Sequence, residues 1–281
     1  MNSTFVVGID VGGQTSKIGV VDARGTVLAQ TVIRTDTYDT VDPYIAELAA
    51  AVKKVIAEAG VEGKVRGIGV GAPNGNYYTG TIENAPNLVW GRQRVEFAKL
   101  LSEAMDGLPV ALTNDANAAA VGEMTYGAAR GMKNFIMITL GTGVGSGIVI
   151  NGEVVYGHDG FAGELGHTIA VRGNGRTCGC GRSGCLEAYC SAMGVARQLV
   201  SGLSFLMSLH SSEVLIQSHL RMCTTLLRKA TSLLLKCSST QERFLVAHSQ
   251  TSSHSAHLRQ SSSSVVLHAL RNSLLSLSLS L

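Results

Sequence analysis

Between residues 163 and 187, one histidine and three cysteines lie at spacings typical of a metal site. Ten residues separate His167 from Cys178, one separates Cys178 from Cys180, and four separate Cys180 from Cys185. One nitrogen and three sulfur donors are what a closed tetrahedral zinc site requires. The sequence therefore predicts a structural zinc site with these four residues as ligands.

Two carboxylates flank the predicted zinc ligands. Glu164 precedes His167 by one helical turn, so the two side chains should project from one face, and Glu187 follows Cys185 by two residues. A bound metal would hold both carboxylates beside the imidazole. The alternatives are that the cysteines are buried or redox-active thiols, or that His158 supplies the fourth ligand, although His158 precedes the motif.

Two glycine-rich turns between hydrophobic runs are candidates for binding phosphate. Their glycines would let backbone N–H groups approach anionic oxygens, and two threonines add hydroxyl donors. The glycines are Gly12, Gly13, Gly141, Gly143 and Gly145, and the threonines are Thr15 and Thr142. Glycine turns between strands are also common in proteins without such a role.

Asp10 and Asp115 are the candidate carboxylates for phosphoryl-transfer chemistry. Asp10 ends the first hydrophobic run, where it could hold Mg²⁺ or its waters, or could cap a turn. Asp115 lies where a strand pattern passes into an alanine-rich helix, beside Asn114. A carboxylate at a helix N-terminus can accept a hydroxyl proton, and an aspartate there is equally a preferred cap.

The elements that would position these residues alternate between strands and helices. Strand patterns lie at 5–10, 17–22, 26–33, 66–71 and 109–114, and an amphipathic helix at 42–59 is closed by Gly60. A second helix should start near Ala116. Residues 135–152 repeat the opening pattern of strand, glycine turn and strand. This order predicts an α/β fold.

Four motifs together resemble the ROK family of bacterial sugar kinases, particularly its glucokinases. They are DVGGQTSK from residue 10, NDANAAAVGE at 114–123, LGTGVGSG at 140–147 and GELGHTIAVRGNGRTCGCGRSGCLE from residue 163. The resemblance runs from about Thr4 to about Leu199. It implies the duplicated actin-like, ribonuclease-H-like fold with two lobes, here divided as 1–113 and 114–200, the second lobe being incomplete.

The resemblance also implies roles for individual residues. Asp115 would be the general base, and Asp10, Lys17 and the two glycine turns would bind ATP with Mg²⁺. The sugar would be bound by Asn114, Asp115, Glu164, His167 and Glu187, with Gly75 and Asn76 as weaker candidates. One ring nitrogen of His167 would ligate zinc while the other meets a sugar hydroxyl. Asn87 could line the same cleft or belong to a turn.

The composition changes at about residue 200. The first 200 residues hold 16 basic and 18 acidic residues, whereas the last 81 hold 7 basic and 2 acidic, with 21 serines and a single glycine. The basic character of the chain therefore belongs to residues 201–281, which lack the glycine-rich adenosine turn that the resemblance implies. Three interpretations remain: out-of-frame translation, a divergent extension, or an amphipathic segment that binds a membrane or a partner.

The expected function is ATP-dependent phosphorylation of a hexose, glucose to glucose 6-phosphate. The alternatives are a kinase for another hexose or an N-acetylhexosamine, such as fructose or N-acetylmannosamine, or an inactive sugar-binding remnant. The sugar-sensing repressors of the family are disfavoured because they begin with a DNA-binding helix-turn-helix. The sequence shows neither a secretory signal peptide nor an apolar run of eighteen residues, and three of its six cysteines cluster with a histidine as reduced metal ligands would. These features favour a cytoplasmic location. No nucleic-acid or membrane partner is expected, and an intact second lobe would form a homodimer.

Overall fold

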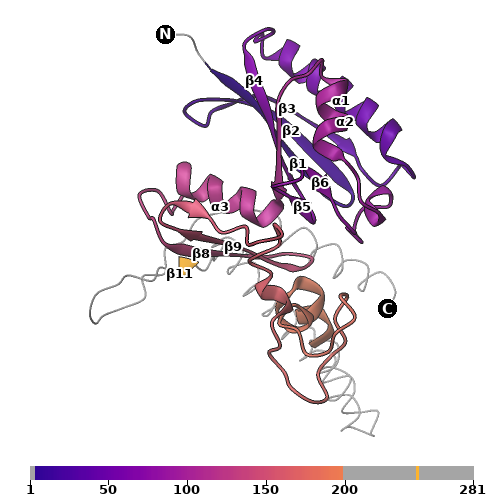
Figure 1. Ribbon diagram of the computed structural model, residues 1–281, viewed down its shortest axis with the longest axis vertical. Coiled ribbons are helices and arrows are strands. Elements are labelled where there is room, and N and C mark those ends of the chain that lie inside the picture. Colours follow the sequence, from indigo (N-terminus) through magenta and orange to yellow (C-terminus); the bar gives the residue numbers. More distant parts are fainter. Residues whose placement is uncertain (1–3, 199–244, 247–281) are drawn as a thin grey trace, which may run out of the picture. The chain divides into compact units, whose positions relative to one another are not determined.

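The computed structural model describes residues 4–198 and 245–246 (Figure 1). The described chain divides into two compact units. The first comprises residues up to 135 together with 147–163, and the second comprises 136–146 and the residues from 164 onward. The predicted boundaries at 113/114 and 200/201 stay predictions, and the residues to which the three interpretations of the C-terminal segment apply lie almost entirely outside the described part.

The first unit is built on a five-stranded sheet in the order β3-β2-β1-β4-β7. β1 pairs antiparallel with β2, and β2 pairs antiparallel with β3, whereas β4 pairs parallel with both β1 and β7. The strands are β1 (Phe5–Val11), β2 (Thr15–Asp22), β3 (Val27–Arg34), β4 (Val65–Ala72) and β7 (Val110–Asn114). The α/β class and every expected strand of this sheet are confirmed.

One face of this sheet carries the hydrophobic core. Val7, Ile9 and Val11 alternate with exposed or half-buried residues along β1, so the buried set points to one side. The helices α1 (Val41–Glu58) and α2 (Phe97–Ala104) cover that side (Figure 1). The predicted helix at 42–59 is thus confirmed.

The end of α1 follows the expected chemistry. Gly60 has a φ of 64°, a left-handed conformation that glycine adopts without a Cβ penalty, and its N–H donates to the carbonyl of Ala57. The chain then turns into β4 through a second glycine of positive φ, Gly63.

A buried polar network joins α1 to the start of β2. The Ser16 hydroxyl lies 2.7 Å from both the Thr35 hydroxyl and the Tyr44 hydroxyl. The Tyr44 ring stacks on Trp90 with 4.7 Å between ring centroids. Burial raises the pKa of Tyr44 to about 12. Strand β2, which follows the first glycine turn, is therefore held against α1 by hydrogen bonds as well as by apolar packing.

Between β4 and β7 the chain forms a short hairpin, a 3₁₀ turn and α2. The hairpin strands are β5 (Gly75–Asn76) and β6 (Thr81–Ile82), and the turn is η1 (Trp90–Arg92). The backbone of Ile82 exchanges hydrogen bonds with Val95, which ties the hairpin to the approach to α2.

The second glycine hairpin consists of β8 (Phe135–Leu140) and β9 (Val144–Ile150), as the sequence predicts. It belongs to a four-stranded sheet in the order β10-β9-β8-β11, with β10 (Glu153–Val154) and β11 (Leu245–Val246) at its edges. After β10 the described chain forms η2 (Leu165–His167), α4 (Glu187–Cys190) and a helical stretch at residues 192–198. None of the helices in the described residues is long and apolar enough to cross a membrane.

Candidate functional site

The first glycine turn, between β1 and β2, leaves no room for side chains. A Cβ on Gly12 would lie 2.8 Å from the Thr15 carbonyl oxygen, and one on Gly13 would lie 2.8 Å from the Asn87 carbonyl oxygen. Neither glycine has a positive φ, so close approach rather than backbone conformation requires glycine here. Asn87, which the sequence could not assign, therefore packs against the candidate phosphate turn through its backbone.

Asp10 and Lys17 face each other across the β1–β2 ladder. They are paired in the strand register, and the Lys17 Nζ lies 4.0 Å from the Asp10 Oδ2, with both side chains largely exposed. Both line an open groove of about 530 Å³ on the sheet face opposite α1, which Thr113 also lines. A carboxylate and an ammonium group are thus available beside the first turn for a metal ion and a phosphate.

An aromatic stack also lines this groove and was not anticipated. The rings of Tyr77 and Tyr156 lie parallel with 4.1 Å between their centroids. They come from the β5–β6 hairpin and from the segment after β10. No local spacing connects them in the sequence.

Asp115 begins helix α3 (Asp115–Thr125), directly after the parallel strand β7. The residue that caps the helix is Asn114, whose Oδ1 accepts a hydrogen bond from the Ala116 N–H at 2.8 Å. The alternative of Asp115 as the cap is therefore wrong, and the helix starts one residue earlier than expected. Asp115 also accepts from that N–H at 2.8 Å.

The electrostatic environment of Asp115 suits a proton acceptor. Burial raises the pKa of the Asp115 carboxyl above its ordinary value of 3.8, and the charge of Asp10 acts in the same direction. The hydrogen bond from Ala116 opposes this rise. A carboxylate whose pKa is raised is a better general base than an aspartate of ordinary pKa.

The two weaker sugar candidates have internal partners. The Asn76 Nδ2 donates to the Asp159 carbonyl at 2.8 Å, and its Oδ1 accepts from the Tyr78 N–H at 3.0 Å. A Cβ on Gly75 would lie 2.5 Å from the Thr113 carbonyl oxygen. These contacts favour a role in holding the hairpin in place, and sugar binding by Gly75 or Asn76 stays a prediction.

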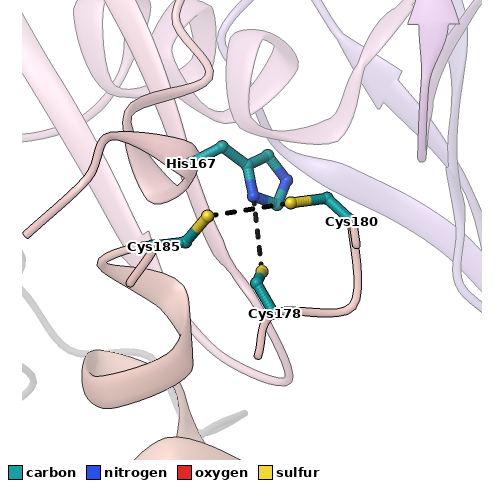
Figure 2. A group of neighbouring side chains, drawn as sticks. All are labelled: His167, Cys178, Cys180 and Cys185. Atoms are coloured by element: carbon teal, nitrogen blue, oxygen red, sulfur yellow. Dashed lines mark hydrogen bonds between the residues drawn. The ribbon is translucent and has the colours of Figure 1, made fainter. Parts of the chain in front are cut away.

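The four predicted zinc ligands come together in the second unit. Their donor atoms all lie within 4.8 Å of one another (Figure 2). The Cys178 Sγ lies 3.7 Å from the His167 Nδ1, and the Cys180 Sγ lies 3.7 Å from the Cys185 Sγ. This nitrogen and sulfur donor set fits zinc, and His158 is not part of the cluster.

Tight backbone turns form the cluster between Cys178 and Cys185. The Cys178 N–H donates to the Arg182 carbonyl, and the Gly181 N–H donates to the Cys178 carbonyl. Gly181 and Gly184 have φ values of 86° and 87°, which side chains rarely tolerate. The interleaved glycines therefore allow three cysteines to converge within eight residues.

The cysteines differ in their proton affinity. Burial raises the pKa of the Cys178 thiol to about 12, whereas the backbone N–H of Arg182 lowers the pKa of Cys180 to about 6. Metal binding requires thiolates, so occupancy of the cluster involves release of the Cys178 proton. Cys190, expected to be an ordinary thiol, is exposed and lies outside the cluster.

Arginines missed by the sequence interpretation support the cluster. The Arg182 guanidinium donates to the His167 carbonyl at 3.1 Å. The Arg176 guanidinium lies 5.0 Å from the centroid of the Tyr189 ring and donates to the Gly194 carbonyl. Arg176 and Arg182 lie in an irregular, glycine-rich segment, so no periodic pattern in the sequence could have predicted these contacts.

Both flanking glutamates belong to the second unit, as do Gly141, Thr142 and Gly143. Glu164 immediately precedes η2 and is exposed, whereas Glu187 is the first residue of α4 and half-buried. Glu187 lies beside the cluster, since the Cys178 Sγ donates to its Oε1 at 3.4 Å.

These features define a class of protein: an α/β chain with two glycine hairpins, a carboxylate at a strand-to-helix junction and a His-Cys₃ cluster. The model of the ROK family matches residues 6–231, and the chain belongs to this family. The match ends past the break expected near residue 199. The family assignment made from the motifs is confirmed.

Individual relatives include both kinases and repressors. A glucokinase from Halalkalibacterium halodurans is 40% identical over 206 residues, which are 73% of this chain and 62% of that protein. A xylose repressor from Caldicellulosiruptor bescii is 32% identical over 188 residues, 66% of this chain and 46% of that protein. The chain thus spans about three fifths of the length of the glucokinase that it matches.

A solved structure supports the fold. The ROK family glucokinase from Streptomyces griseus, in complex with glucose and AMPPNP, has a TM-score of 0.58 and 35% identity. The match covers 69% of this chain and 60% of that one. The described residues accordingly have the actin-like fold of the ROK proteins.

Proposed function

We propose that this chain phosphorylates a hexose with ATP, and that glucose is the substrate, giving glucose 6-phosphate. The observation that carries the proposal is the position of Asp115, a carboxylate of raised pKa that is accessible to solvent at the carboxyl end of β7 and the start of α3. The identity to glucokinases supports the choice of sugar.

In the proposed reaction, Asp115 accepts the proton of the sugar hydroxyl that attacks the γ-phosphate of ATP. The bond from that hydroxyl oxygen to phosphorus forms in line as the bond to the leaving ADP oxygen breaks. Asn114, one residue earlier, contributes to binding the sugar through its Nδ2, since its Oδ1 is used by the helix cap. Glu164, His167 and Glu187 supply the remaining contacts with the sugar hydroxyls.

The nucleotide would be held by the two glycine turns. Gly13 and Thr15 would offer backbone and hydroxyl donors in the first turn, where the Gly12 N–H already donates to the Thr15 carbonyl. Thr142 and Gly143 would offer them in the second, where the Gly141 N–H already donates to the Gly143 carbonyl. Asp10 would hold the Mg²⁺ that accompanies ATP, and Lys17 would contribute positive charge beside it. Zinc in the His-Cys₃ cluster would fix the orientation of the His167 ring and would take no part in phosphoryl transfer.

The test is glucose-dependent formation of ADP and glucose 6-phosphate by the purified full chain. Asp115→Asn should lower kcat by about 10²- to 10⁴-fold because it removes the general base while preserving shape. Its affinity for glucose should change by less than about threefold. Glu103→Gln, at an exposed position on α2, is the matched control. An Asp115→Asn variant that turns over at the normal rate would contradict the proposal.

Sugar binding without phosphorylation is the second candidate function, and the identity to a xylose repressor favours it. It predicts that calorimetry detects glucose or xylose binding while no ADP is produced. Comparing glucose, mannose, fructose and N-acetylmannosamine in the same assay identifies the preferred sugar.

A further inference from the structure

Glu187 contacts two separate parts of the second unit. Its Oε1 accepts a hydrogen bond from the Cys178 Sγ at 3.4 Å, and its Oε2 accepts one from the Val144 backbone N–H at 3.0 Å. Val144 begins β9, directly after the glycine turn, and is separated from Glu187 by 43 residues. The Glu187 carboxylate therefore lies between the cysteine cluster and the second candidate phosphate turn, and its bond to the Val144 N–H does not depend on the Cys178 proton.

Gly143 provides the space for this carboxylate. A Cβ at position 143 would lie 2.6 Å from the Glu187 Oε2, which is closer than side-chain carbons approach other atoms. Gly143 does not have a positive φ, so alanine at this position would be compatible with the backbone conformation. Its Cβ would instead displace the Glu187 carboxylate. The absence of a side chain at position 143 thus allows Glu187 to bond the turn.

Backbone contacts add two further connections. The Ala192 N–H donates to the Gly141 carbonyl at 2.9 Å, directly beyond α4. Gly166, next to the ligand His167, lies so close to the Val144 carbonyl oxygen that a Cβ could not be accommodated. Residues before and after the cysteine cluster in the sequence, Gly166 and Ala192, therefore both contact the turn at residues 141–144.

We propose that Glu187 is a positioning residue for the turn at residues 141–144. Its carboxylate holds the Val144 amide, and the turn keeps the arrangement in which its remaining N–H groups can receive phosphate. The phosphate role of the turn rests on the proposed function, but the positioning itself does not. This role is additional to the sugar contact proposed for Glu187.

The first experiment measures amide hydrogen exchange of the full chain, followed in the peptide that contains Val144. Glu187→Ala should speed exchange of the Val144 amide by about tenfold or more, because a hydrogen bond to a charged group is lost. Glu187→Gln retains an acceptor oxygen and should restore most of the protection. Glu103→Gln should leave the exchange unchanged.

Two controls show that the variants remain folded. Exchange in β1 and β2 of the first unit should be unaltered, and the zinc content of Glu187→Ala should match that of the unaltered chain. Unchanged protection of Val144 in Glu187→Ala, with these controls satisfied, would overturn the proposal.

The second experiment is a double-mutant cycle on the binding of AMPPNP. Gly143→Ala displaces the Glu187 carboxylate and should weaken AMPPNP binding by about fivefold or more. In a Glu187→Ala background the same substitution has no carboxylate to displace, so its effect should be less than about twofold. Equal effects in both backgrounds would mean that the two residues act independently and would overturn the proposal.

The two experiments separate this inference from the proposed function. If the unaltered chain binds no AMPPNP, the phosphate role of the turn fails. The exchange measurement then decides by itself whether Glu187 positions the turn.

Discussion

The side chains of Asn114 and Asp115 accept the same backbone N–H, that of Ala116, each at 2.8 Å. Asn114 stands outside the helix with extended backbone angles, and Asp115 is the first helical residue. The cap therefore orients the residue proposed as the general base. The junction of β7 and α3 therefore contributes both to the stability of the helix and to the proposed chemistry. Measurements of stability and of its pH dependence distinguish the two contributions.

Replacing the cap should destabilise the first unit. Asn114→Ala removes the acceptor for the Ala116 N–H and is expected to lower the free energy of unfolding by about 1 kcal/mol. Asn114→Ser preserves a capping oxygen and should recover most of that loss. Urea unfolding of the two variants checks this, and equal stability of the alanine variant and the unaltered chain would show that Asp115 alone satisfies the helix end.

The raised pKa of Asp115 makes a prediction about pH. Since its folded pKa lies above the unfolded value, the folded state binds the proton more tightly, and stability is lost as pH rises through the folded pKa. Asp115→Asn should therefore be more stable than the unaltered chain at pH 7 and show no such gain below about pH 4. Thermal unfolding at the two pH values measures the difference. If Asp115→Asn were stabilised by the same amount at both pH values, the effect could not come from titration of Asp115.

The four-ligand cluster predicts about one zinc per chain. Cys178→Ser or Cys185→Ser should reduce this to a small fraction, because three ligands hold zinc much less tightly than four. Cys190→Ser is the matched control, since Cys190 is exposed and outside the cluster. Elemental analysis of the purified variants is the measurement. Full zinc content in Cys178→Ser, or loss in Cys190→Ser, would refute the ligand assignment.

The network of Ser16, Thr35 and Tyr44 should contribute measurably to the stability of the first unit. Tyr44→Phe removes the hydroxyl but leaves the stack on Trp90, so we expect a loss of about 1 kcal/mol. The exposed Tyr78→Phe serves as a control with a smaller effect.

The same network has a pH signature. Because the folded pKa of Tyr44, about 12, exceeds its ordinary value of 10.0, this stabilisation is complete below pH 10 and is lost as the pH rises toward 12. Urea unfolding between pH 8 and 11 tests it. A difference between Tyr44→Phe and the unaltered chain that stays constant over this range would exclude titration of Tyr44.

Much of the local structure follows from short-range patterns. The alternating residues of β1 and β2, the amphipathic α1 and its end at Gly60 were all predictable because each depends on neighbours within a few residues. The zinc donor set was predictable for the same reason, since its cysteines lie within one tight loop. The motifs likewise identified the family.

Other contacts depend on residues far apart in the chain. Asn76 looked available for a sugar, yet its amide donates to the Asp159 carbonyl, 83 residues away. Tyr77 and Tyr156 stack without any sequence signal that could pair them. Asn114 and Asp115 were both candidates for chemistry, and only the helix geometry determined which of them is the cap.

The sequence by itself determined the elements, the metal donors and the family, because periodicity, turn chemistry and ligand spacing act over short stretches of chain. Only the tertiary structure decided that Glu187 reaches the Val144 amide and that Gly143 leaves space for it. The physical reason is that a hydrogen bond between distant residues depends on how the backbone folds back on itself, and no local pattern encodes that path.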